Sequence, residues 1–173
     1  MSQGPTIAVY IVTEGQWQAH GISPAKRALI LRQVLTLHDE LEKLNVPLIV
    51  LSANSFNDIP DALADFARTH SVKQIFFNEE YEVNEKACAE QLIDRLKQQG
   101  VLSSCHHDAC LIEPGLIRNK QGEPYKVYSA FKRAYIQNFS GHARSILNRP
   151  EAQTPTSVSA DVSGMPNNYA DFA

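Results

Sequence analysis

The fold of this chain is decided by its first apolar run, residues 6–12, which read TIAVYIV. Apolar side chains occupy successive positions rather than alternate ones, so both faces of a strand formed here would be buried. Strands of that kind are typical of a parallel sheet that is covered by helices on both sides. The run therefore predicts the first strand of an α/β domain.

Helix and strand signals alternate along the residues that follow. Ser23 and Pro24 open a helix, because serine caps helix starts and proline suits the first helical position, and Asn45 closes it. The other predicted elements are strands at residues 47–51, 72–77 and from 101, the last resuming at 110–112, and helices starting at 57–60 and spanning 83–99. This alternation predicts right-handed crossovers and a Rossmann-like, three-layer α/β domain with a mostly parallel sheet.

Composition places the chain among globular, water-soluble proteins. Its 173 residues suit one domain with a tail, and a formal net charge of −3 disfavours nucleic-acid binding through bulk charge. Three cysteines, an odd and low count, argue against a disulfide framework and indicate a reducing compartment. No secretory signal and no apolar run of membrane-helix length is present. We therefore expect a cytoplasmic protein.

The sequence pattern changes after Pro114. Residues 125–139 are aromatic and basic and predict a helix over part of their length. From Arg149 the chain is rich in Pro, Ser, Thr, Ala and Asn, a composition that buries too little apolar surface to order itself. We therefore expect an α/β domain over residues 6–140 and a linker or disordered tail over residues 141–173.

The richest polar segment follows the third predicted strand, where an open α/β sheet binds its ligands. Residues 78–85 read NEEYEVNE, and Asn84 and Glu85 fall in the first turn of the next helix, where the helix dipole favours a carboxylate. The alternative interpretation is a capped helix start with a solvated acidic face. No glycine-rich phosphate loop is present, which disfavours a dinucleotide held by its pyrophosphate.

Three stretches resemble one known family. Residues 16–24 read QWQAHGISP, residues 78–87 read NEEYEVNEKA, and residues 125–135 read YKVYSAFKRAY. Together they are similar to the N-terminal, antenna-binding α/β domain of bacterial class I DNA photolyases, within the photolyase and cryptochrome family. Each stretch alone is a weak signal, whereas the three in the family's order and at suitable spacing are specific.

The resemblance implies a function and a site. Members of this family reverse ultraviolet-induced pyrimidine dimers with light, using reduced FAD in a C-terminal helical domain. An antenna pigment, often a methenyltetrahydrofolate, lies between the domains, and the resemblance places its contacts at His20, Asn84 and Glu85. The chemistry fits, because a pterin edge presents two parallel N–H donors that one carboxylate can accept together.

The chain departs from this family at its beginning. By the resemblance, we expect the family's first strand and helix to be absent here, and the implied strand order 3-2-1-4-5, in the family's count, would make the absent strand the central one. We expect a gap of about 9–10 Å, two strand spacings, with unpaired edges on either side. Such a chain should be destabilised, close the gap, or associate with another chain through those edges.

By the resemblance, we also expect the chain to stop before the helical flavin domain. By the resemblance, FAD and DNA bind only through that domain, which is the partner of this one and supplies the other wall of the antenna pocket. We therefore expect half an antenna site, without tight folate binding, and no photorepair by this chain alone.

Other clusters and functions stay open. Residues 105–110 (CHHDAC) hold possible metal ligands, but one short cluster rarely closes a zinc tetrahedron, so we favour an incidental cluster and expect no metal. Nothing marks a catalytic nucleophile. Residues 125–135 fit an amphipathic helix packed on the sheet better than a nucleic-acid patch.

The alternative functions are a nucleotide-binding module like those of stress proteins and electron-transfer flavoproteins, and a non-catalytic fragment that acts by association.

Overall fold

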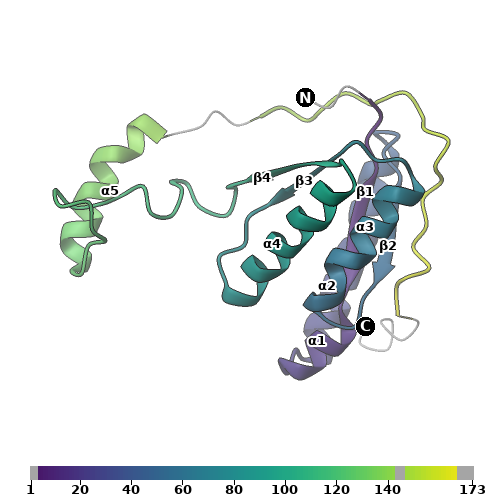
Figure 1. Ribbon diagram of the computed structural model, residues 1–173, viewed down its shortest axis with the longest axis horizontal. Helices are drawn as coiled ribbons and strands as arrows, with labels where there is room; N and C mark the ends of the chain where they lie inside the picture. Colours follow the sequence, from purple (N-terminus) through teal and green to yellow (C-terminus); the bar gives the residue numbers. More distant parts are fainter. Residues whose placement is uncertain (1–3, 143–146, 167–173) are drawn as a thin grey trace. The chain divides into compact units, whose positions relative to one another are not determined.

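The computed structural model describes residues 4–142 and 147–166. Strands and helices alternate as the sequence predicts (Figure 1). They group into a small unit, residues 76–81 and 104–148, and a large unit made of residues 1–75, 82–103 and 149–173. In chain order the elements are β1 Ala8–Val12, α1 Glu14–Ala19, α2 Pro24–Glu42, β2 Leu48–Ser52, the 3-10 helix η1 Phe56–Asp58, α3 Ile59–Thr69, β3 Gln74–Asn78, α4 Val83–Gln98, β4 Leu102–His106 and α5 Tyr128–His142.

The core of the large unit is built on the parallel pair β1–β2. The register runs from Ala8 opposite Leu48 to Val12 opposite Ser52. Val12 is fully buried, as the apolar sequence of this strand predicts. One apolar cluster joins both strands to α2 and to a methionine near the end of the chain: Val12, Leu31, Val34, Leu48, Val50 and Met165.

Helix α2 begins at Pro24, where its sequence signals place it, and ends at Glu42, shortly before the predicted end at Asn45. The Ser23 hydroxyl accepts a hydrogen bond from the Lys26 amide at 3.3 Å, and Pro24 occupies the first helical turn. Beyond the helix, Asn45 adopts a left-handed φ of 55°, which asparagine tolerates better than most residues. The chain can therefore turn directly into β2.

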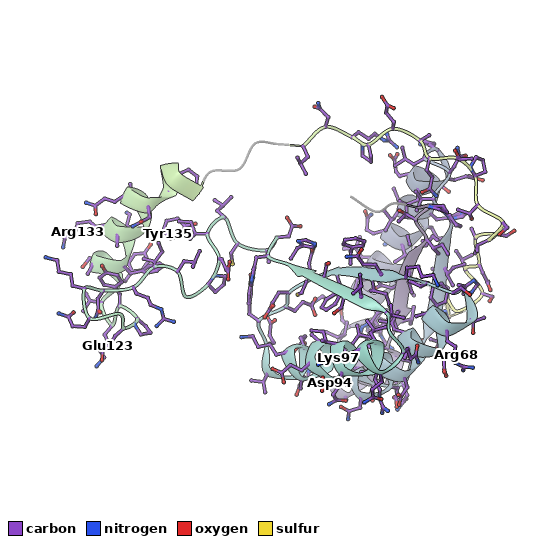
Figure 2. All side chains as sticks on the ribbon, turned by 45° about the horizontal axis from the view of Figure 1, so that its top comes forward. Arg68, Asp94, Lys97, Glu123, Arg133 and Tyr135 are labelled. Atoms are coloured by element: carbon purple, nitrogen blue, oxygen red, sulfur yellow. The ribbon has the colours of Figure 1, made fainter. Side chains whose placement is uncertain are left out.

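Helices α3 and α4 pack against each other in the large unit (Figure 1). Ser55 and Asp58 form a reciprocal capping box ahead of α3, in which the Asp58 carboxylate accepts from the Ser55 amide at 2.9 Å. Leu92 and Leu96 are the buried residues of α4 and lie four positions apart, hence on one face. Charged residues such as Asp94 and Lys97 occupy exposed positions of the same helix (Figure 2).

The strands form two separate two-stranded sheets, β1–β2 and β3–β4. At the two ends of the second pair, the Leu102 amide donates to the Lys73 carbonyl at 2.9 Å, and the Glu79 amide donates to the His106 carbonyl at 2.8 Å. No strand among the described residues joins β1 to β3. The gap is therefore not closed by pairing β1 with β3.

The predicted resumption of the last strand at residues 110–112 is wrong, because these residues form bends. Ile112 is buried, with 5% of its surface exposed, whereas Leu111 is 69% exposed. The apolar run therefore supplies one buried anchor to the small unit and does not extend the β3–β4 sheet.

The end of the chain is ordered over residues 149–166, which we call the strap. Asp161 pairs with Ile49 in a parallel bridge at the outer edge of β2, and its carbonyl accepts from the Val50 amide at 2.7 Å. Met165 is buried in the β1–β2 core. The expectation of disorder fails for these residues because backbone hydrogen bonds and the buried side chain of Met165 hold them in place. Amino-acid composition gives no information on either kind of contact. That residues 141–173 form a linker to a further domain stays a prediction.

Gln153 fastens the strap at its other end. Its side-chain amide donates to the carbonyls of Thr6 and Asn45 at 2.9 and 2.7 Å, and its side-chain oxygen accepts from the Thr6 amide at 2.7 Å. The strap therefore ties the residues ahead of β1 to the turn ahead of β2.

In the small unit, helix α5 confirms the helix predicted from the aromatic and basic segment. Phe131, Tyr135 and Phe139 recur every four residues, and successive ring centroids lie 5.8 and 6.4 Å apart. Arg133 and Tyr135 extend from this helix in Figure 2. Within residues 4–142 and 147–166, no helix has the length and apolar character needed to cross a bilayer.

Candidate functional site

The first turn of α4 carries two of the predicted site residues. Val83 is the first helical residue, so Asn84 and Glu85 occupy the second and third positions, where backbone N–H groups have no acceptor within the helix. Asn84 is exposed and Glu85 is half-buried. The N-cap residue, Glu82, makes no side-chain capping hydrogen bond. The helix start therefore presents a carboxylate and an amide beside unsatisfied backbone donors.

His20, the third predicted site residue, lies at the C-terminal end of α1. Its Nε2 atom is 2.7 Å from the Gln16 side-chain nitrogen. Since that amide nitrogen can only donate, Nε2 accepts and the ring proton is assigned to Nδ1. His20 is exposed and belongs to the large unit, as do Asn84 and Glu85. Among the described residues no hydrogen bond or ion pair joins His20 to either of them, so a shared cleft stays a prediction.

Helix α1 holds His20 in place and was not predicted from the sequence. It is six residues long, has no buried residue, and its N-cap Thr13 makes no side-chain hydrogen bond, so no apolar stripe or cap marks it. Tertiary contact fixes it instead, because the Gln16 amide donates to the Asn54 carbonyl at 2.9 Å. Gly15 permits this approach, since a Cβ atom there would lie 2.7 Å from the same carbonyl oxygen.

A hollow of about 190 Å³ lies elsewhere in the large unit, between the end of α2 and the strap. His38, Glu42 and Thr156 are among the residues that line it. None of the three predicted site residues contributes to this hollow, so it gives the antenna site no support.

A second polar cluster, in the small unit, joins the exits of β3 and β4. The Tyr81 hydroxyl lies 3.0 Å from His107 Nδ1, and the two rings are stacked with centroids 5.9 Å apart. His107 Nε2 lies 3.1 Å from a Glu113 carboxylate oxygen. A carboxylate only accepts, so Nε2 carries a proton, and in the neutral ring Nδ1 accepts from the Tyr81 hydroxyl. We call this arrangement the Tyr81–His107–Glu113 chain.

Desolvation is the largest cause of a raised pKa at two weak acids of this cluster. Desolvation, followed by the negative charges of Cys110 and Glu79, raises the pKa of the Tyr81 phenol. Burial and a 3.4 Å hydrogen bond to Glu79 raise the pKa of the Cys105 thiol. At neutral pH the phenol and the thiol therefore act as hydrogen-bond donors.

The cluster does not form a metal centre in the structure. Within residues 4–142 and 147–166, no three histidine, cysteine or acidic side chains converge so as to hold a metal ion. Instead, Cys105 donates to Glu79, and the Asn78 side-chain amide donates to Asp108 at 3.3 Å. These side-chain contacts thus link the end of β4, at residues 105–108, to the end of β3, at residues 78–79. The sequence placed both segments after strands, but nothing in their spacing identified these partners.

Most of the chain matches one protein family. Residues 1–155 match the family model for DNA photolyase. The chain belongs to the DNA photolyase family. Among its photolyase relatives, the deoxyribodipyrimidine photo-lyase of Vibrio cholerae is 36% identical over 138 residues, covering 80% of this chain and 29% of the relative. The Escherichia coli photolyase is 27% identical over 157 residues, covering 91% of this chain and 33% of the relative. The chain thus corresponds to the N-terminal part of photolyases and spans about a third of their length.

Two solved photolyase structures share the fold. A class III photolyase from Agrobacterium tumefaciens gives a TM-score of 0.63 at 22% identity, covering 98% of this chain and 32% of that protein. An archaeal photolyase from Sulfolobus tokodaii gives 0.61 at 20% identity, covering 99% of this chain and 36% of that protein. The archaeal structure holds two FAD molecules and is described as implying a novel light-harvesting cofactor. These similarities confirm the predicted Rossmann-like α/β fold of a photolyase N-terminal domain.

Proposed function

We propose that this chain is the antenna half of a light-driven DNA repair enzyme and that its pigment is a methenyltetrahydrofolate. The observation that carries the proposal is the position of Asn84 and Glu85 on consecutive residues in the first turn of α4, in a chain of the photolyase family. A half-buried carboxylate, an amide and unsatisfied backbone N–H groups there meet the hydrogen-bonding needs of a pterin edge.

Each proposed contact has a distinct chemical role. Glu85 accepts two parallel N–H groups of the pterin, and charge-assisted bonds of this kind contribute about 1.5–3 kcal/mol each when shielded from water. Asn84 donates and accepts beside it. His20 stacks on the pigment or hydrogen-bonds to it at the rim through the nitrogen that Gln16 does not occupy. The other wall of the pocket belongs to a domain outside this chain, so we expect binding to be weak.

A titration with methenyltetrahydrofolate tests the pigment. Glu85→Gln replaces one acceptor oxygen by a donor and should weaken binding about tenfold or more. Glu90→Gln, an exposed glutamate on the same helix, is the matched control and should leave binding unchanged. Equal loss in both variants, or in neither, would contradict the assignment. Binding of FAD, but not folate, that depends on Glu85 would keep the antenna role and reject the folate.

Repair itself should need the rest of the enzyme. The catalytic FAD and the damaged DNA are expected to bind through a helical domain that this chain, at about a third of photolyase length, does not span. The purified chain, supplied with reduced flavin and blue light, should therefore reverse no pyrimidine dimers. Dimer reversal under those conditions would refute this part of the proposal. A cytoplasmic location is also part of the proposal, supported by Cys88, Cys105 and Cys110, which form no disulfide in the described part of the chain.

Association through β1 is a second candidate function, favoured by one observation. Among the described residues β1 pairs only with β2, yet its sequence, AVYIV, has the apolar character of a central strand. It carries neither the lysine nor the proline that commonly protects an edge. Sedimentation over a range of concentrations should reveal self-association if this edge is used, whereas a monomer at every concentration would reject it.

A further inference from the structure

We propose that the strap protects the outer edge of β2 and so prevents this edge from pairing with a second copy of the chain. The strap, β1 and β2 all belong to the large unit, so the contacts that carry the proposal lie within one unit. An uncovered strand edge is a template for pairing with another chain, and natural sheets commonly cover such an edge with a loop. The proposal does not depend on the antenna role or on the pigment.

The outer edge of β2 is formed by the backbone groups of alternate residues. The Pro47 carbonyl and the Ala53 amide both form hydrogen bonds to the β1 side, at 2.9 and 2.8 Å. Successive residues of a strand direct their backbone groups to opposite sides of that strand. Leu48, Val50 and Ser52 therefore direct theirs away from β1, to the side on which the strap lies.

The strap occupies the middle of this edge. The Asp161 amide donates to the Leu48 carbonyl at 3.0 Å, and the Asp161 carbonyl accepts from the Val50 amide at 2.7 Å. These two bonds form a parallel bridge, the pairing that a further parallel strand would make. Gly164 lies so close to Val50 that a Cβ atom there would be 2.8 Å from the carbonyl carbon. An incoming strand would meet bonded groups and the backbone of the strap.

Contacts on both sides of Asp161 hold the strap in this position. Before it, Arg149 pairs with Glu40 at 2.9 Å, and the Gln153 amide donates to the Leu44 carbonyl at 3.0 Å. After it, Met165 is buried in the β1–β2 core. Because these contacts are intramolecular, a second chain has to displace a segment that is already in place.

A second copy of the chain is the expected partner, because β1 is a strand of the matching kind. It pairs in parallel with β2 and, in the part of the chain that the structure describes, with no other strand. By the alternation described above, Val9 and Ile11 direct their backbone groups away from β2. The β1 edge of one copy therefore suits an uncovered β2 edge of the next, and such a head-to-tail contact is repeatable. This step rests on the second candidate function, association through β1.

Sedimentation velocity of the full chain over a range of concentrations tests the protection. Asp161→Pro removes the amide that bonds to Leu48, and Gly164→Ala adds the obstructing Cβ atom, so the double variant should release the strap. It should form oligomers at concentrations about tenfold lower than the parent chain, because the strap's hydrogen bonds no longer compete. Ser159→Pro is the matched control, since the Ser159 amide makes no hydrogen bond within residues 4–142 and 147–166, and it should sediment like the parent.

Amide hydrogen exchange identifies the strand that is used. In the double variant at low concentration, the Val50 amide should exchange about tenfold faster than in the parent chain, the effect of one hydrogen bond. Rising concentration should slow this exchange again. Unchanged exchange at Val50, or fast exchange without association at any concentration, would overturn the proposal.

The same experiment separates the strap from the β1 edge. Protection that grows with concentration at Val9 and Ile11 but not at Val50 would support association through β1 and reject the protecting role of the strap. Protection that grows at Val50 alone would support that role and reject β1 as the partner strand. The Ala53 amide, within the β1–β2 pair, should stay protected throughout. If it does not, the single variant Gly164→Ala, judged by the same criteria, decides.

Discussion

Gly164 shows, at the scale of single residues, how closely the strap approaches β2. A Cβ atom at this position would meet the Val50 carbonyl oxygen and lie 2.8 Å from its carbon. Backbone atoms of a strand cannot move aside as the end of a side chain can. A glycine is therefore required here by close approach, and its φ lies outside the positive range.

Gly164→Ala should lower the free energy of unfolding by about 1–3 kcal/mol, the usual cost of overpacking a well-packed contact. Urea unfolding followed by circular dichroism measures the change. Gly4→Ala is the matched control, because no atom lies within 4 Å of the added Cβ. Unfolding midpoints that coincide for the two variants would mean that the strap does not pack on β2 in solution.

Leu96 is the clearest test of the core formed by α4. It is fully buried at 0% exposure, so Leu96→Ala should cost about 2–5 kcal/mol of unfolding free energy through lost burial and a cavity. Leu37→Ala, at a 44% exposed helical position, should change stability little. The comparison uses the same substitution in the same class of secondary structure. A similar loss in both would indicate that α4 does not pack as described.

At the scale of elements, the strap contains an internal hydrogen bond, between Ser163 and Asp161, that is sensitive to acid. The Ser163 amide donates to the Asp161 carboxylate at 2.8 Å, and hydrogen bonds from the Ser163 side chain and backbone hold the pKa of Asp161 below its usual range. A lowered folded-state pKa contributes stability above the unfolded-state pKa, about 3.9 for aspartate. That contribution is lost as the pH falls through the folded-state pKa.

Asp161→Asn should therefore lower stability at pH 7 and show a smaller loss than the parent chain as the pH falls from about 4. Urea midpoints measured from pH 7 to pH 2 give the comparison. Asp39→Asn, at an exposed position of α2, controls for the loss of one negative charge. Parallel pH profiles for the parent chain and Asp161→Asn would contradict the prediction.

At the scale of the whole molecule, buried surface is divided unequally between the two units. Among the described residues, Ile112 is the one buried hydrophobic residue of the small unit, while every other core residue belongs to the large unit. Apolar burial is the main favourable term in folding, so the small unit has little to hold it. Its structure should open at a lower free energy than that of the large unit.

The Phe131 amide, which donates to the Val127 carbonyl at 3.1 Å at the start of α5, should thus exchange faster than its counterpart in the large unit. That counterpart is the Arg27 amide, which donates to the Ser23 carbonyl at 3.0 Å at the start of α2. Urea should likewise release α5 before the β1–β2 core. A single transition, coincident at both amides, would show that the two units unfold together.

The sequence by itself determined most of the regular elements and the place of two of the proposed site residues. The apolar run at residues 6–12 predicted β1, Ser23 and Pro24 predicted the start of α2, and the segment at residues 83–99 predicted α4 to within a residue. Asn84 and Glu85 accordingly lie in the helical turn to which their sequence assigns them. These features depend on neighbours along the chain, through backbone preference, capping and apolar periodicity, which a sequence displays directly.

Only the tertiary structure decided which distant segments meet. Tyr81 and His107 are 26 residues apart, and Gln153 bonds to Thr6 across 147 residues. The composition of the strap predicts disorder, because its order comes from pairing with the open edge of β2. Helix α1 was not predicted because six residues are too few to show an apolar periodicity. Such contacts depend on which backbone groups and cavities folding leaves free, and these do not exist until the rest of the chain is in place.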